Sequence, residues 1–175
     1  FILIGLALKA AAFPLHSWLP DAYTQAPSMV TVFLASTSTK VAVYVLIRCL
    51  YHVFPQEYWS QLLLPSFLLL SGCLGMLYGS YKAIQQDSIR RLLAYSSVAQ
   101  LGYMVVGIGL NNETGLTATV VHLFNHAITK GALFMAAGMV FYRMHTTSLH
   151  QLRGAGKTMP WTTGALWLTA HRAAI

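Results

Sequence analysis

The chain of 175 residues is 56% hydrophobic and only 9% charged, whereas a soluble domain carries about 25% charged residues. This composition excludes an ordinary soluble globular protein and indicates an integral membrane protein. The formal net charge of +7 includes no run of basic residues interleaved with aromatic ones, so we expect no binding of nucleic acid.

The first apolar segment runs from Phe1 to about Leu19 and contains Pro14, with Pro20 directly after it. Proline removes a backbone donor and clashes with the preceding turn, so we expect the helix to break at Pro14 and Pro20. In transporters, broken helices often mark ion sites, because protein groups or water must meet the freed carbonyls. The alternative is a helix that ends at the membrane interface, with Trp18 as an aromatic anchor.

Four further apolar segments approach or exceed the length of about 20 residues that a spanning helix needs. They cover about residues 29–54, 59–81, 92–110 and 116–142, and a sixth segment begins near Met159 and stops at Ile175. We therefore expect an all-α integral membrane bundle of about five to six transmembrane helices, the first of them discontinuous.

The distribution of charge among the loops indicates an orientation. Loops 82–91 and 143–158 carry an excess of Lys and Arg, whereas the intervening turns contain Glu57 and Glu113 and no basic residue. By the positive-inside rule, both basic loops should face the cytoplasm, with the chain crossing the cell inner (plasma) membrane several times.

Three lysines lie near the middle of predicted spans: Lys9, Lys40 and Lys130. Each costs about 2.5–3.5 kcal/mol at the centre of a membrane helix, and all four acidic residues lie in turns. The lysines must face water, lose their charge for part of the time, or pair with carboxylates outside this sequence. Each option fits proton handling, because removal from water disfavours the charged form of lysine. For Lys40, snorkelling to the interface is the alternative.

The segment HLFNHAITK places His122, His126 and Lys130 four residues apart, on one face of a helix. Histidine titrates near neutral pH, so this stripe could pass protons through water. Two alternatives are structural hydrogen bonds and a metal site, although H-E-x-x-H is absent and no third ligand is nearby. The segment YSSVAQLGYM, with Ser96 and Ser97, could line a hydrated path or join helices.

Four segments together resemble the antiporter-like membrane subunits shared by respiratory complex I (NADH:quinone oxidoreductase), Mrp-type cation/proton antiporters and membrane-bound hydrogenases. These segments are KAAAFPLHSWLPDAYTQAP, TKVAVYVLIR, DSIRRLLAYSSVAQLGYM and HLFNHAITKGALFMAAGMVFYR. The spacing of Lys9 and Lys40 is similar to that in the D-type member of the Mrp antiporters and in the fourth antiporter-like chain of complex I. The QAP, STSTK and HLFNH stretches favour the D-type Mrp member.

The resemblance implies that five residues lie on a hydrated central axis that moves protons, together with the break at Pro14 and Pro20. The five are Lys9, Lys40, His122, His126 and Lys130. In the family, an acidic residue on an earlier helix pairs with the counterpart of Lys9. The partners that the resemblance implies are other subunits of a multisubunit membrane complex, the lipid bilayer, protons, and possible Na⁺ through the complex.

Residues 1–165 would then form part of the proton-translocating domain of a larger subunit. Residues 166–175 contain His171 and Arg172 where the family has apolar residues, which predicts a truncated or frameshifted tail.

The expected function is proton translocation as part of a multisubunit cation/proton antiporter, with no catalytic residue, cofactor or metal in this chain. One alternative is an antiporter-like subunit of NADH:quinone oxidoreductase or a membrane-bound hydrogenase, a redox enzyme whose chemistry other subunits perform. A second is a structural anchor, for which Lys40→Ala and Lys130→Ala would retain full transport. Because the spans contain no carboxylate, we do not expect this chain to bind Na⁺ directly.

Overall fold

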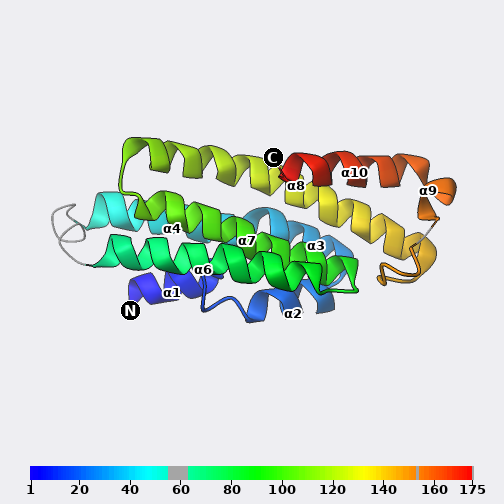
Figure 1. Ribbon diagram of the computed structural model, residues 1–175, viewed down its shortest axis with the longest axis horizontal. Coiled ribbons are helices and arrows are strands. Elements are labelled where there is room, and N and C mark those ends of the chain that lie inside the picture. The colour runs from blue at the N-terminus through cyan, green and yellow to red at the C-terminus, as the bar shows by residue number, and fades with distance from the viewer. Residues whose placement is uncertain (55–62, 153, 175) are drawn as a thin grey trace.

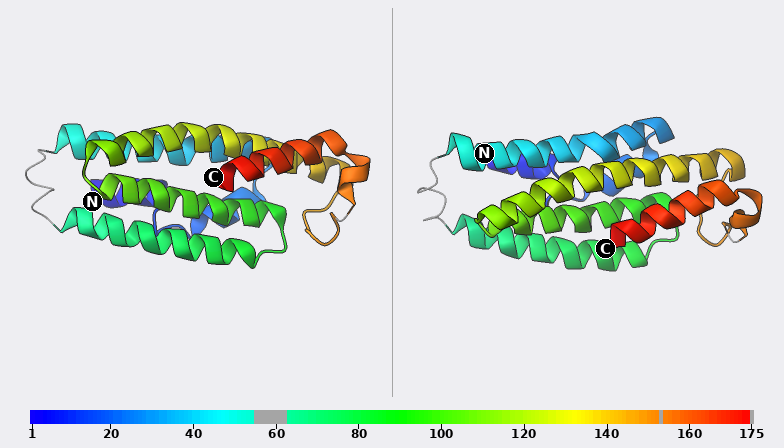
Figure 2. Two further views of the ribbon diagram at one scale, coloured as in Figure 1. Left: turned by 45° about the horizontal axis from the view of Figure 1, so that its top comes forward. Right: turned by 90° about the horizontal axis from the view of Figure 1, so that it is seen from above.

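The computed structural model describes residues 1–54, 63–152 and 154–174, and helices form its regular structure (Figure 1). The predictions that fall on residues 55–62, Arg153 and Ile175 lie outside the described residues. The α-helices are α1 (Ile2–Lys9), α2 (Trp18–Gln25), α3 (Ser28–Phe33), α4 (Thr39–Arg48), α6 (Leu64–Ile84), α7 (Ile89–Gly109), α8 (Glu113–Met144), α9 (Ala155–Thr158) and α10 (Pro160–Ala174). Two π-helical segments, η1 (Leu34–Ser38) and η2 (Cys49–Val53), continue α3 and α4 into one helix. The long helices lie side by side in an elongated bundle in all three views (Figures 1 and 2).

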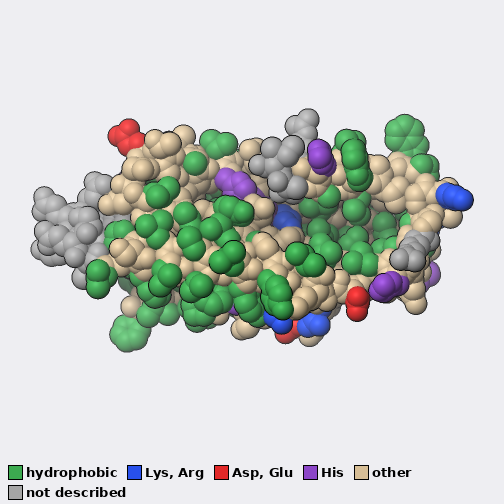
Figure 3. Space-filling view, in the orientation of Figure 1, with side chains coloured by type: hydrophobic (Ala, Val, Ile, Leu, Met, Phe, Trp, Pro, Cys, Tyr) green, Lys and Arg blue, Asp and Glu red, His purple; other side chains and the backbone are tan. Residues whose placement is uncertain are grey.

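Within the described ranges, three helices are long and apolar enough to cross a membrane: the run Ser28–Val53, α6 and α7. The 32 residues of α8 extend about 48 Å at about 1.5 Å per residue, which exceeds the hydrocarbon thickness of about 30 Å. α8 is not among the three candidate spans, because the polar residues in its middle lower its mean hydropathy. Hydrophobic side chains cover much of the visible face of the bundle, as expected for a surface that meets lipid (Figure 3). The predicted all-α membrane fold is therefore confirmed.

Helices α6 and α7 pack closely along their length, and glycines at their contact take the place of larger side chains. A Cβ atom at Gly79 would lie 2.6 Å from the backbone nitrogen of Ala99, and one at Gly102 would lie 2.8 Å from the carbonyl oxygen of Gly72. Small residues at such contacts let two membrane helices approach through their backbones. One side of α7 thus packs against α6, and α7 also packs against α8, which it contacts with polar residues.

Arg90 joins three helices at the end of the bundle where α7 begins and α8 ends. Its Nη2 donates a hydrogen bond of 2.6 Å to Ser28 Oγ at the start of α3. Its guanidinium carbon lies 4.6 Å from the ring centroid of Phe141 on α8, a cation–π contact. The neighbouring Arg91 forms an exposed ion pair with Asp21, at 2.9 Å. Arg90 therefore joins α7 to α3 and α8 through partly buried contacts, whereas Arg91 joins α7 to α2 at an exposed site.

We expect Arg90→Gln to destabilise the full-length subunit by about 1–3 kcal/mol, because it removes a charge-assisted hydrogen bond and the aromatic contact. Arg91→Gln should cost less than about 1 kcal/mol, the usual range for an exposed ion pair. The midpoint of thermal unfolding in detergent measures both. Equal shifts for the two variants would show that Arg90 does not join the helices as described.

Candidate functional site

The first predicted span is divided into α1 and α2 by residues 10–17 (Figure 1). The indole Nε1 of Trp18 donates to the carbonyl oxygen of Leu8 at 2.9 Å, which also accepts from Ala11 N at 3.0 Å, so a side chain at the start of α2 is tied to the end of α1. Pro14 lies within the break. Pro20 lies instead in the first turn of α2, where a backbone N–H has no intrahelical partner and proline is tolerated. The discontinuous first helix predicted from the sequence is confirmed.

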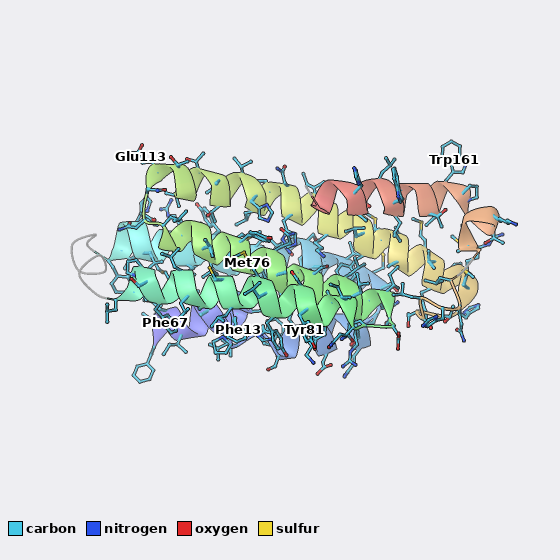
Figure 4. All side chains as sticks on the ribbon, viewed as in Figure 1. Phe13, Phe67, Met76, Tyr81, Glu113 and Trp161 are labelled. Carbon is cyan, nitrogen blue, oxygen red and sulfur yellow. The ribbon has the colours of Figure 1, made fainter. Side chains whose placement is uncertain are left out.

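The break packs against α6 through aromatic side chains. The ring centroids of Phe13 and Tyr78 are 5.7 Å apart, and Phe13 lies close to α6 (Figure 4). The buried ring of His16 stacks on Phe13 at 5.4 Å and meets Tyr78 edge-on at 4.8 Å. The sequence analysis did not single out His16, although a histidine two residues after Pro14 in a membrane segment was a usable signal.

Lys40 lies in the interior, 3% exposed, two residues after the π-helical segment η1. Its Nζ donates to the carbonyl oxygen of Ala35, within η1, and to Thr39 Oγ1 at 3.3 Å. A π-helical turn is uncommon and often marks a functional position. Because both acceptors belong to the same continuous helix, the amine of Lys40 folds back on its own helix instead of extending to an interface.

The stripe on α8 is half-buried at one end and fully buried at the other. The rings of His122 and His126 stack in nearly parallel planes, 5.9 Å apart, with His122 half-buried and His126 only 4% exposed. Among the described residues, neither ring nitrogen of His126 has a hydrogen-bond partner. Lys130, 2% exposed, donates from Nζ to the carbonyl oxygen of Leu93 at 2.9 Å and to Ser96 Oγ at 2.6 Å.

The helical run Ser28–Val53 and α8 bring four predicted residues together, here called the basic cluster: Lys40, His122, His126 and Lys130. The helix that carries Lys40 packs against α8, and a Cβ atom at Gly131 would lie 3.5 Å from Ser36 Cβ of η1. Lys40 is close enough to act electrostatically on the other three members of the basic cluster. The acidic residues that the structure describes, Asp21, Asp87 and Glu113, are all exposed.

Lys9 is the fifth predicted residue, and the structure places it differently. It is the last residue of α1 and its side chain is exposed. A cation at this position is stabilised by the carbonyl end of the helix dipole. The interior basic cluster therefore contains four of the five residues predicted from the sequence.

An open groove of about 670 Å³ runs along the first half of α8. Its lining residues include Glu113, Thr117, His122 and Asn125. Glu113 lies at the very start of α8 (Figure 4). The groove therefore leads from the end of the bundle to the half-buried member of the basic cluster.

The fold and the cluster together define a polytopic α-helical membrane protein that keeps basic side chains in its interior. The chain belongs to the NADH:quinone oxidoreductase/Mrp antiporter transmembrane family, which matches residues 1–174. The family predicted from the sequence is thus confirmed, and the match extends through the predicted tail.

Similar proteins come from several complexes. The chain is 42% identical over 167 residues to NADH-quinone oxidoreductase subunit N of Desulforudis audaxviator, covering 94% of this chain and 33% of that protein. It is 36% identical over 158 residues to subunit M of Pseudomonas aeruginosa, covering 90% and 30%.

Two solved structures are also similar. One is the Mrp complex from Dietzia sp., with a TM-score of 0.92 and 34% identity, covering 98% of this chain and 32% of that one. The other is the membrane-bound sulfane sulfur reductase, an archaeal respiratory membrane complex, with a TM-score of 0.88 and 35% identity, covering 95% and 34%. The chain spans about a third of the length of these relatives.

Proposed function

We propose that this chain is the proton-translocating part of a cation/proton antiporter-type subunit, and that protons move along the basic cluster. The observation that carries the proposal is the burial of two lysines and a histidine from two helices at one interior place. Both lysines are held there by neutral oxygens of the backbone and of hydroxyl groups.

The electrostatics of the basic cluster support exchange of protons between its members. Like charges repel one another at short range in a poorly solvated interior. A proton bound to one member of the basic cluster therefore makes it easier for the next member to release its own proton. A conformational or charge change in a partner subunit would therefore move a proton from one member to another. From His122 to Lys130 the stripe rises about 12 Å, which stacked rings and intervening water can bridge. The groove along α8 would give water access to His122.

Lys9 and the break belong to the proposal through the resemblance to the family. An exposed Lys9 at the end of α1 would receive or release protons outside the basic cluster, after pairing with an acidic residue elsewhere in the complete subunit.

We further propose that the chain works inside a multisubunit complex in the plasma membrane, with loops 82–91 and 143–158 in the cytoplasm. The named relatives include a subunit of NADH-quinone oxidoreductase, a respiratory membrane complex and an Mrp complex. The described parts of the two basic loops lie together: Leu149 N donates to the carbonyl oxygen of Asp87 at 2.8 Å, and Ile89 N donates to that of Thr147 at 2.9 Å. Their shared position supports a shared side of the membrane.

The test is transport by the complete complex, with the full-length subunit, in everted vesicles from a host without its own Na⁺/H⁺ antiporters. ATP hydrolysis acidifies the vesicles, and addition of NaCl should then release protons, which a fluorescent amine reports. Vesicles without the complex should not respond. Acidification driven by NADH with no response to NaCl would instead support the redox-complex alternative, and proton movement by neither route would leave only a structural anchor.

A further inference from the structure

The amine of Lys130 is bound on the neighbouring helix rather than along its own. The stripe on α8 would place it one turn from His126, yet both of its hydrogen bonds go to α7, to Leu93 O at 2.9 Å and Ser96 Oγ at 2.6 Å. α7 therefore determines where this amine rests.

The protons at this contact can be assigned from the hydrogen bonds. Ser96 Oγ donates its single proton to the carbonyl oxygen of Leu93 at 3.0 Å. A hydroxyl that donates in this way has its lone pairs free, so it accepts from Lys130. Ser97 Oγ also donates to Leu93 O, at 2.9 Å, but the structure gives it no bond to Lys130. Two adjacent serines on one helix thus differ in whether they touch the amine.

We infer that Ser96 is a positioning residue for proton transfer at Lys130, holding the amine in place both before and after the proton leaves. While Lys130 is protonated, Ser96 accepts one of its three N–H bonds. When the ammonium gives a proton to a neighbouring water, the neutral amine gains a lone pair. The Ser96 hydroxyl can then rotate from Leu93 O to donate to that lone pair. No covalent bond at Ser96 forms or breaks, and the transferred proton stays on the path through Lys130.

This inference rests on the proposed function and adds a third helix to the site. A lysine has a long side chain with many conformers, so an amine without a fixed partner would spend time away from the transfer geometry. A hydroxyl is suited to both protonation states, because it can donate as well as accept. The backbone carbonyl of Leu93 can only accept, so it holds the ammonium but cannot donate to the neutral amine.

The experiment compares five variants of the full-length subunit in the complete complex: Ser96→Ala, Ser96→Cys, Ser96→Thr, Ser97→Ala and Lys130→Ala. We expect Ser96→Ala and Ser96→Cys to lower the initial rate of NaCl-driven proton release about tenfold, the ratio expected from the loss of a hydrogen bond to a charged group. Ser96→Thr restores the hydroxyl and should transport normally. Ser97→Ala removes a hydroxyl of equal size one residue away and should also transport normally. Native gels report the amount of assembled complex, to which each rate is scaled.

The outcomes separate this inference from the proposed function. If Lys130→Ala abolishes release while Ser96→Ala and Ser96→Cys keep the wild-type rate, Ser96 has no positioning role and the proposed function stands. If Ser96→Thr is as slow as Ser96→Ala, or Ser97→Ala is equally slow, the effect comes from packing and the inference fails. A wild-type rate for Lys130→Ala would overturn both. If Ser96→Ala does not assemble, the rate of Ser96→Cys tests the inference instead. Cysteine leaves no cavity, and its sulfur is only a weak hydrogen-bond acceptor.

Discussion

Lys40→Ala in the full-length subunit is expected to slow NaCl-driven proton release about 100-fold, the lower end of what a positioned proton-transfer group contributes. In the proposed relay, Lys40 carries protons and its charge acts on the other three members of the basic cluster, so its loss would remove both of these contributions. Its hydrogen bonds stay within one continuous helix, to Ala35 and Thr39, so its removal breaks no hydrogen bond between helices. The complex should therefore assemble.

The comparison variants for Lys40 address volume and charge. Lys40→Met keeps most of the side-chain volume and should be as slow as Lys40→Ala if the amine matters. Lys157→Ala removes an exposed lysine near the end of the bundle and should leave the rate unchanged. The proposal is wrong if assembled Lys40→Ala and Lys40→Met complexes both release protons at the wild-type rate.

His126→Leu is expected to abolish transport while preserving or raising stability. Among the described residues, neither ring nitrogen of His126 has a protein partner, so replacement by leucine breaks no hydrogen bond to the protein. Leucine fills a similar space, but it cannot carry a proton between His122 and Lys130. Measured on the same variant, transport in vesicles should be lost, whereas the thermal midpoint of the purified subunit in detergent should stay the same or rise.

This pair of measurements also separates the alternatives that the sequence leaves open for His126. A histidine with a structural hydrogen-bonding role would lose stability on conversion to leucine, by about 1 kcal/mol or more. His52→Leu, which changes an exposed histidine, should transport at the wild-type rate. A clear fall in the thermal midpoint of His126→Leu would favour the structural role.

Much of the fold follows from local features of the sequence. Apolar length predicted the helical run Ser28–Val53, and turn residues placed the boundaries of α7 and α8 within a few residues. Proline at position 14 predicted the break, because its effect on a helix does not depend on distant contacts. The four-residue spacing in α8 placed His122, His126 and Lys130 on one face for the same reason.

The remainder depends on contacts between segments far apart in the sequence. In a π-helical turn each backbone hydrogen bond spans one residue more than in an α-helical turn. No residue pattern in the sequence therefore predicted η1 before Lys40. The partner of Lys130 is 34 residues away, on α7, and only packing of α7 against α8 brings Ser96 to it. Likewise, the exposed position of Lys9 depends on how α1 docks, which spacing along the chain does not determine.

The uncharged acceptors of Lys40 and Lys130 bear on ion selectivity. Backbone and hydroxyl oxygens leave the positive charge of an ammonium uncompensated, so the electrostatic potential inside this part of the bundle is positive whenever either amine is protonated. A pore wall of that sign repels alkali metal ions, whereas a proton passes by exchange between groups and water without a cation ever entering. Sodium and protons would then follow separate routes through the complex, and isotope flux of sodium in the Lys40→Ala variant would show whether the two routes are separate.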